Sequence, residues 1–176
     1  GFPKHFCDNM NDMIKNDLIL AVPSSGMHSN GYSLIRKIVE LSGLNWNDSC
    51  PFSPEISLGE SLITPTKIYV TSILPLIKDN MLLGLSHITG GGITENTPRM
   101  LPKHLTFDID ITSFPRPAVF KWLQDTGKID ESEMLRSFNC GIGMVLAVKP
   151  NKMNETLERL ESSGETAWVI GQLKNA

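Results

Sequence analysis

Polar side chains and glycines gather in one short segment whose chemistry suits an anion. Residues 25–31 read Ser-Gly-Met-His-Ser-Asn-Gly, between an apolar run at 17–22 and an amphipathic stretch that starts at Tyr32. This pattern predicts a loop between a buried strand and a helix, where the N–H groups at the helix start attract negative charge. A plain polar turn with an Asn cap has the same composition, and the spacing of a P-loop is absent. The candidate phosphate ligands are Ser25, Gly26, His28, Ser29, Asn30 and Gly31.

A second glycine-rich turn starts at His87 and runs through residue 92, again at the end of an apolar stretch. Three consecutive glycines indicate a sharp bend, or a close approach of the backbone to something else. Two such turns in one small domain favour a ligand crevice at the carboxyl ends of the strands. The alternatives are a buried histidine bonded to a backbone carbonyl, and glycines that allow tight packing of helix on sheet. The candidate binding residues are Thr89, which could also cap the next helix, and Gly90, Gly91 and Gly92.

Several other polar residues are weaker candidates. Arg99 could reach a phosphate, but the pattern favours an ion pair on a helix surface. Cys140 has no CxxC partner and no basic neighbour in sequence, which predicts a structural thiol. His5 and His104 show no metal-ligand spacing, so no metal site is predicted. The full set of additional site candidates is Arg36, Glu95, Asn96, Arg99 and Asn139.

Alternating strand and helix patterns predict the elements that position these residues. Strands are expected at 17–22, 82–88, 105–111, 142–148 and 166–173. Helices are expected at 32–42, at 64–77 with Pro65 in its first turn, just after Gly92, and at 117–124, 130–137 and 152–160. Residues 44–59 read as a surface excursion. The pattern favours one α/β or α+β domain, with a mixed sheet covered by helices.

Length and composition limit the function classes. The 176 residues are 40% hydrophobic, which is enough for one core. Sixteen basic and 19 acidic residues give a formal net charge of −3 without a basic run, which argues against nucleic acid. No apolar stretch approaches the length of a membrane span, and no signal peptide is recognisable. Three widely spaced cysteines favour free thiols in the cytosol, and the absence of an initiator Met suggests a piece of a longer chain.

Five blocks in order resemble AIR synthetase, the cyclo-ligase of purine biosynthesis that acts on formylglycinamidine ribonucleotide. They lie at 23–36, 64–70, 87–102, 138–144 and 167–171. The similarity runs from Asp17 to Gly171 and covers only the C-terminal half of that enzyme. Residues 1–16 depart from the family pattern and are expected to be a linker or extension, with the family domain at 17–176. The sequence is closer to the form of the enzyme found within trifunctional purine proteins.

The resemblance implies a fold and an activity. The family domain has an α/β/α layered fold with partial likeness to a ferredoxin-like fold. In the family reaction, ATP activates the formyl oxygen of formylglycinamidine ribonucleotide, and an amidine nitrogen then closes the imidazole ring. The resemblance further implies that an N-terminal domain binds most of the ATP and Mg²⁺ and forms a homodimer. By this resemblance, His87 is the expected catalytic residue, as a hydrogen-bond donor to the formyl oxygen or as a proton carrier.

Two other functions remain open at this point. One is a non-catalytic module that binds phosphate or a partner, since half of an active site is not expected to catalyse ring closure alone. The other is a different ATP-dependent enzyme of the same superfamily. The histidine before the sequence Ile-Thr-Gly-Gly discriminates against this second alternative, because the relatives are expected to carry an acidic residue there.

Overall fold

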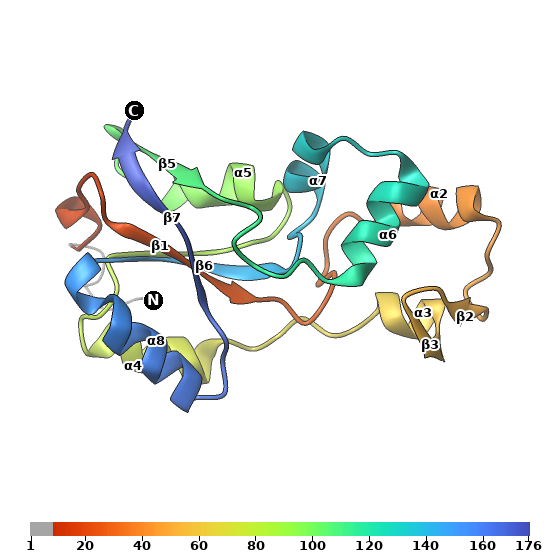
Figure 1. Ribbon diagram of the computed structural model, residues 1–176, viewed down its shortest axis with the longest axis horizontal. Coiled ribbons are helices and arrows are strands. Elements are labelled where there is room, and N and C mark those ends of the chain that lie inside the picture. Colours follow the sequence, from red (N-terminus) through yellow and green to blue (C-terminus); the bar gives the residue numbers. More distant parts are fainter. Residues whose placement is uncertain (1–8) are drawn as a thin grey trace.

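The computed structural model describes residues 9–176 (Figure 1). His5, Cys7 and the first half of the predicted N-terminal extension lie outside the described residues. The strands are β1 (Leu18–Pro23), β2 (Ser49–Cys50), β3 (Ser53–Ser57), β4 (Gly84–His87), β5 (Leu105–Ile109), β6 (Ile142–Val148) and β7 (Trp168–Asn175). The α-helices are α2 (Tyr32–Ser42), α3 (Leu58–Leu62), α4 (Val70–Lys78), α5 (Gly92–Asn96), α6 (Ala118–Gly127), α7 (Glu131–Ser137) and α8 (Met153–Ser162). Short 3₁₀ turns lie at Met10–Asp12, Thr97–Met100 and Pro150–Lys152.

A five-stranded sheet with the order β4-β6-β1-β7-β5 forms the centre of the fold. The predicted class, helices layered on a sheet, is confirmed. The predicted mixture of parallel and antiparallel strands is not found, because every neighbouring pair in this sheet is antiparallel. The reason is that no two strands that follow one another in the chain are neighbours in this sheet. β1 and β4 run in the same direction with β6 between them, and β6 and β7 run together with β1 between them, as in split βαβ units.

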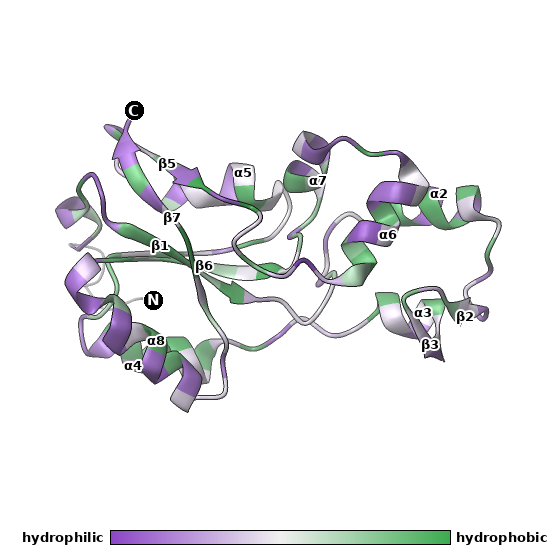
Figure 2. Cartoon of the chain, in the orientation of Figure 1, coloured by the Kyte–Doolittle hydropathy of each residue, from purple (hydrophilic) through white to green (hydrophobic). Residues whose placement is uncertain are grey.

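Both faces of the central strands are covered. On β1, Ile19 and Ala21 pack in a core with Ile93 of α5, on one face of the sheet. Leu20 and Val22 alternate with them and pack toward α4 and α8 on the opposite face (Figure 1). Figure 2 shows the resulting hydrophobic character along β1 and β6. Burial of both faces explains why these strands read as continuous apolar runs rather than as alternating patterns.

A third core lies beyond the end of the sheet at which β1 finishes. It is built from α2, α3, α6 and α7, which gather at that end of the molecule (Figure 1). Phe120 and Phe138 are its largest fully buried side chains, with ring centroids 6.4 Å apart. The molecule is therefore elongated, with the two glycine-rich turns near the junction of the sheet and these helices.

Two sequence expectations are wrong here. Residues 44–59 are not a simple surface excursion, because β2 and β3 pair and α3 begins with a capping box between Ser57 and Glu60. Cys50 and Leu58 of this segment are fully buried against the third core. The helix expected from residue 64 begins only at Val70, because residues 64–69 are held in a connector that crosses the end of β1.

Three further features concern the N-terminal segment, the cysteines and the helices. Met13, inside the predicted N-terminal extension, is buried in the core that also holds α5. Cys50 and Cys140 are buried free thiols. Among the described residues, none of the helices combines the length and apolar character that crossing a membrane would require.

Candidate functional site

The two glycine-rich turns lie at the same end of the sheet. β1 and β4 both finish there, and the first residues of β6 lie between them. The N–H of Ser24 donates to Gly141 O at 2.9 Å, and the N–H of Ile88 donates to Gly143 O at 2.9 Å. Both turns are thus anchored to the start of β6, which brings together two segments that are sixty residues apart in sequence.

The two turns share an open hollow of about 560 Å³. Ser29 and Gly31 line it from the first turn, and Gly90 and Gly91 line it from the second. The start of α2 adds Tyr32 and Ser33, so the amide end of an eleven-residue helix faces this space. The structure therefore places part of the predicted anion-binding set around one cavity.

Charged residues of both signs also line the hollow. Glu95 of α5 was a sequence candidate, whereas Arg136, Glu133 and Ser137 of α7 were not. Arg136 is paired with Glu133 at 2.8 Å. No local signal indicates that α7 approaches the turns, because its position depends on tertiary packing of the third core.

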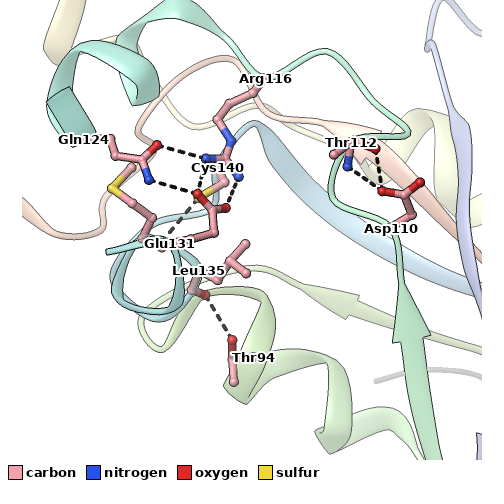
Figure 3. A network of polar contacts seen from close by, with 9 residues as sticks. Thr94, Asp110, Thr112, Arg116, Gln124, Glu131, Leu135 and Cys140 are labelled. Carbon is pink, nitrogen blue, oxygen red and sulfur yellow. Dashed lines mark hydrogen bonds and ion pairs between the residues drawn. The ribbon is translucent and has the colours of Figure 1, made fainter. Parts of the chain in front are cut away.

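Polar contacts hold α7 in this place (Figure 3). Arg116, in the connector before α6, pairs with Glu131 at the start of α7, and Gln124 of α6 donates to the same carboxylate at 2.9 Å. Thr94 Oγ1 of α5 donates to Leu135 O at 3.4 Å. The pairing with Arg116 lowers the pKa of Glu131, which keeps the carboxylate charged.

Cys140 behaves as a structural thiol. Its Sγ donates to Met134 O at 3.3 Å, and burial raises its pKa to about 12 (Figure 3). A thiol in this state is not a nucleophile near neutral pH.

His28 is a buried histidine whose protonation is set by its neighbours. Its side chain is only 4% exposed. Its Nε2 accepts from the backbone N–H groups of Ser25 at 3.2 Å and Lys67 at 3.5 Å. Because Nε2 is an acceptor, the proton of the neutral ring lies on Nδ1. Nδ1 is buried and has no hydrogen-bond partner among the described residues.

His87 lies exposed at the end of β4, next to His28. The ring centroids of the two histidines are 6.0 Å apart, and Tyr69 lies 6.3 Å from His28 and 6.0 Å from His87. Tyr69, which the sequence did not single out, donates through its hydroxyl to Pro23 O at 2.7 Å. Tyr69 and His28 meet over Gly143, where an added Cβ would lie 1.7 Å from the Tyr69 hydroxyl and 3.0 Å from His28 Cε1. Glycine at this position is what allows the cluster to form.

The electrostatics favour neutral rings. Burial, together with the charges of His87 and Lys67, lowers the pKa of His28 to about 4. Partial burial also lowers the pKa of His87. Burial and the nearby Glu165 carboxylate raise the pKa of Tyr69. Near neutral pH the cluster therefore offers neutral imidazoles and a protonated phenol, which can donate or accept hydrogen bonds and relay a proton.

Two candidate asparagines face inward and hold the turns. Asn139 is fully buried, donates to Gly26 O at 2.9 Å and accepts from Ser24 Oγ and Gly141 N. Asn96 donates to the carbonyls of Thr89, Gly90 and Gly92. Neither amide lines the hollow, so both shape the site from beneath rather than facing a ligand.

The remaining candidate binding residues also have structural contacts or lie outside the hollow. Thr89 does not cap α5 with its side chain, which donates to Asn96 Oδ1 at 3.1 Å; Gly91 occupies the N-cap. Gly92 has a φ of 58°, and a Cβ there would lie 2.0 Å from Leu135 O, so tight packing explains this glycine. Arg99 donates to Asn96 Oδ1 at 3.1 Å instead of forming the considered ion pair. Arg36 is exposed on α2 and does not line the hollow.

The described residues do not form a metal centre of their own. In the part of the chain from residue 9 onward, no group of three or more His, Cys, Asp or Glu side chains could hold a metal ion.

Known proteins are similar to this chain in sequence and in fold. The family model described as "AIR synthase related protein, C-terminal domain" matches residues 15–176. The chain belongs to the AIR synthase related family. The match covers both glycine-rich turns and all of the described helices and strands from β1 onward.

A curated relative is the bifunctional purine biosynthetic protein ADE1 of Schizosaccharomyces pombe. It is 52% identical over 159 residues, which are 90% of this chain but only 20% of that protein. The chain thus spans one fifth of the length of the curated relative it matches.

Solved structures show the same fold at low identity. HypE of E. coli, a hydrogenase maturation protein, is 20% identical with a TM-score of 0.58, over 93% of this chain and 45% of that one. PurL of T. maritima, in complex with AMPPCP, is 13% identical with a TM-score of 0.52, over 91% of this chain and 22% of that one. These likenesses establish the fold.

Proposed function

We propose that this chain is the C-terminal part of an AIR synthetase, which closes the imidazole ring of formylglycinamidine ribonucleotide in an ATP-dependent reaction. Family membership and 52% identity to a purine biosynthetic protein support the proposal. The observation that carries it is the position of His28 and His87, whose ring centroids lie 6.0 Å apart between two glycine-rich turns. The product is 5-aminoimidazole ribonucleotide.

The hollow between the turns receives the ribonucleotide. Backbone N–H groups at the start of α2 and the small residues of both turns suit its phosphate. The carboxylates of Glu95 and Glu133 favour a ligand that also carries hydrogen-bond donors, and the ribose hydroxyls and the amidine provide them. Arg36 and Arg99 have no part in this hollow.

His87 is the residue that touches the reacting atoms. Its exposure at the end of β4 allows contact with substrate, and its lowered pKa favours the neutral imidazole. It acts either as a donor to the formyl oxygen or as a proton carrier after the amidine nitrogen attacks.

ATP and Mg²⁺ are held mainly by a domain that precedes this one in a longer, multidomain polypeptide, in which 17–176 is the C-terminal domain. ATP supplies the activation of the formyl oxygen when it is bound. The difference in length from the relative supports such a polypeptide. PurL, of the same fold, was solved with AMPPCP and with FGAR, which supports a nucleotide and a ribonucleotide as ligands here. We place the enzyme in the cytosol, as a homodimer.

The preceding domain covers an apolar groove beside His87. The groove, of about 360 Å³, lies between α4 and the edge strand β4, and Lys67, Tyr69 and His87 lie along it. Ile68 is 77% exposed and Val70 is 62% exposed at its rim. Such adjacent exposed apolar side chains mark a protein interface. Covering this groove would enclose the histidine cluster and exclude water from it.

The decisive variant is His87→Ala in the full-length enzyme. We expect kcat to fall by at least about 100-fold, the usual contribution of a general acid or base. His104→Ala, which changes an exposed histidine outside the site, is the matched control and should retain activity. A kcat for His87→Ala within about twofold of wild type would show that His87 is only a packing residue.

The alternative function, binding without turnover, is the behaviour that we expect of the isolated chain. We expect the 176 residues alone to show no cyclisation and weak nucleotide affinity. ATP-dependent turnover by the isolated chain would contradict the proposed division of the site between two domains.

A further inference from the structure

Glu165 is a buried carboxylate to which the proposed chemistry gives no role. It lies in the loop between α8 and β7 and is only 7% exposed. Its Oε2 is 2.5 Å from Lys67 Nζ, and Ser72 Oγ of α4 donates to its Oε1 at 3.5 Å. A buried carboxylate is stable only when it is paired, so this contact fixes the end of the Lys67 side chain.

Lys67 belongs to the connector 63–69, which joins α3 to α4 across the end of β1. Ser25 Oγ donates to Pro65 O at 2.7 Å, and Tyr69 donates to Pro23 O at 2.7 Å, so the connector touches the first glycine-rich turn near one end and the last residue of β1 at the other. Between them, the N–H of Lys67 donates to His28 Nε2 at 3.5 Å. The ammonium of Lys67 lies 5.8 Å from the centre of the Tyr69 ring.

The connector has no regular structure, and contacts that involve side chains hold its path. Among them are three neutral hydrogen bonds, those with Ser25 and Tyr69 near its ends and the one from the Lys67 N–H to His28. Another is the ion pair with Glu165, which reaches the connector from a loop far along the chain. Because Lys67 contacts His28 through its backbone and Glu165 through its side chain, a change at Glu165 is transmitted to the imidazole.

We propose that Glu165 is a positioning residue of the site: through Lys67 it holds the connector so that His28 keeps Nε2 as an acceptor and its proton on Nδ1. The proposal rests on the proposed function only in that His28 belongs to the substrate site. The tautomer itself can be observed without substrate or catalysis, so a failure here is separable from a failure of the proposed activity.

The test is long-range ¹H–¹⁵N NMR of the imidazoles in the 176-residue chain, together with hydrogen exchange of the Lys67 amide. In the wild-type chain, His28 should show one protonated Nδ1 and one unprotonated Nε2. In Glu165→Gln, the two nitrogen signals should move toward each other as tautomers mix, and the Lys67 amide should exchange about tenfold faster. The matched control is Asp79→Asn, which breaks an ion pair of equal length between Asp79 and Arg159, away from the site. This control variant should leave the two His28 nitrogen signals and the exchange rate of the Lys67 amide unchanged.

A folded Glu165→Gln chain with an unchanged His28 tautomer and an unchanged Lys67 amide would overturn the proposal. If the single variant does not fold, the double variant Lys67→Met/Glu165→Gln removes both charges and avoids an unpaired buried ion. In that variant, mixed tautomers support the proposal and the wild-type tautomer refutes it.

Discussion

Single residues in this site owe their chemical state to burial and to backbone donors. His28 is neutral because its imidazole is almost fully enclosed and because two N–H groups point at Nε2. A positive ring would have to donate at Nε2, where the surrounding groups are themselves donors. The same enclosure leaves Nδ1–H without a partner among the described residues.

The first prediction concerns pH. Since the pKa of His28 is about 4 in the folded chain and about 6.5 when unfolded, the unfolded state binds more protons between these values. The contribution of His28 to stability is therefore complete above pH 6.5 and is lost as the pH falls toward 4, by at most about 1.4 kcal/mol per pH unit. His87, whose pKa is also lowered, adds in the same direction.

Urea unfolding at several pH values between 7 and 4 measures this slope. In His28→Gln the slope should become shallower, whereas His104→Gln should match the wild-type chain. An unchanged slope in His28→Gln would mean that this ring is not held neutral.

The second prediction concerns the close approach at Gly143. In Gly143→Ala the new Cβ meets the Tyr69 hydroxyl and lies 3.0 Å from His28 Cε1, so we expect a loss of about 2 kcal/mol in unfolding free energy. Gly90→Ala is the matched control, because no atom lies within 4 Å of its added Cβ. Its free energy of unfolding should stay within about 0.5 kcal/mol of wild type. Equal stabilities of the two variants would contradict the described ring cluster.

At the scale of elements, the site is made by connectors rather than by helices or strands. The two turns after β1 and β4 are tied to the start of β6, and buried amides complete the ties. Asn139 joins the first turn to β6, and Asn96 fills the curve of the second. The elements set the distance between the turns, and these amides set their shape.

The third prediction tests this division at Asn139. Asn139→Ala leaves Gly141 N without its acceptor in a buried position and removes one of the two donors to Gly26 O, which should cost about 2 kcal/mol of stability. Hydrogen exchange should quicken in residues 24–31 more than in the sheet. Asn154→Ala, at an exposed position on α8, is the control and should change neither. Uniform quickening across the chain would argue against a local role.

The individual strands and turns could be predicted from the sequence, but their assembly into a sheet and a site could not. Apolar runs and glycine signals indicated the strands and turns, since both depend on neighbouring residues. The antiparallel pairing was missed, because the skipped strands are a property of the whole sheet. Asn96 and Asn139 were predicted as ligands, since an amide that faces inward looks the same in sequence as one that faces a ligand. Tyr69 and Arg136 were missed because distant segments bring them to the site.

At the scale of the whole molecule, the histidine cluster is open on the side of the apolar groove. Exposed Ile68 and Val70 lie where a preceding domain would enclose His87. The chain spans one fifth of the length of the relative. A further domain of a longer protein that covers the groove would therefore explain why these apolar side chains are exposed here.

The fourth prediction follows from the groove. Ile68→Lys should leave the unfolding free energy of the isolated chain within about 0.5 kcal/mol of wild type, since the side chain is 77% exposed there. In the full-length enzyme it should lower both activity and thermal stability, because a charge would then be buried between domains. Leu41→Lys, at a side chain 73% exposed on α2, is the matched control and should have neither effect. Full activity of Ile68→Lys would place the domain contact elsewhere.

The most direct test of the central claim is a crystal structure of the full-length enzyme with formylglycinamidine ribonucleotide bound. We predict that the phosphate lies in the hollow between residues 29–31 and 90–91, with the formyl group within hydrogen-bond distance of His87. A ribonucleotide that contacts neither glycine-rich turn would contradict the account.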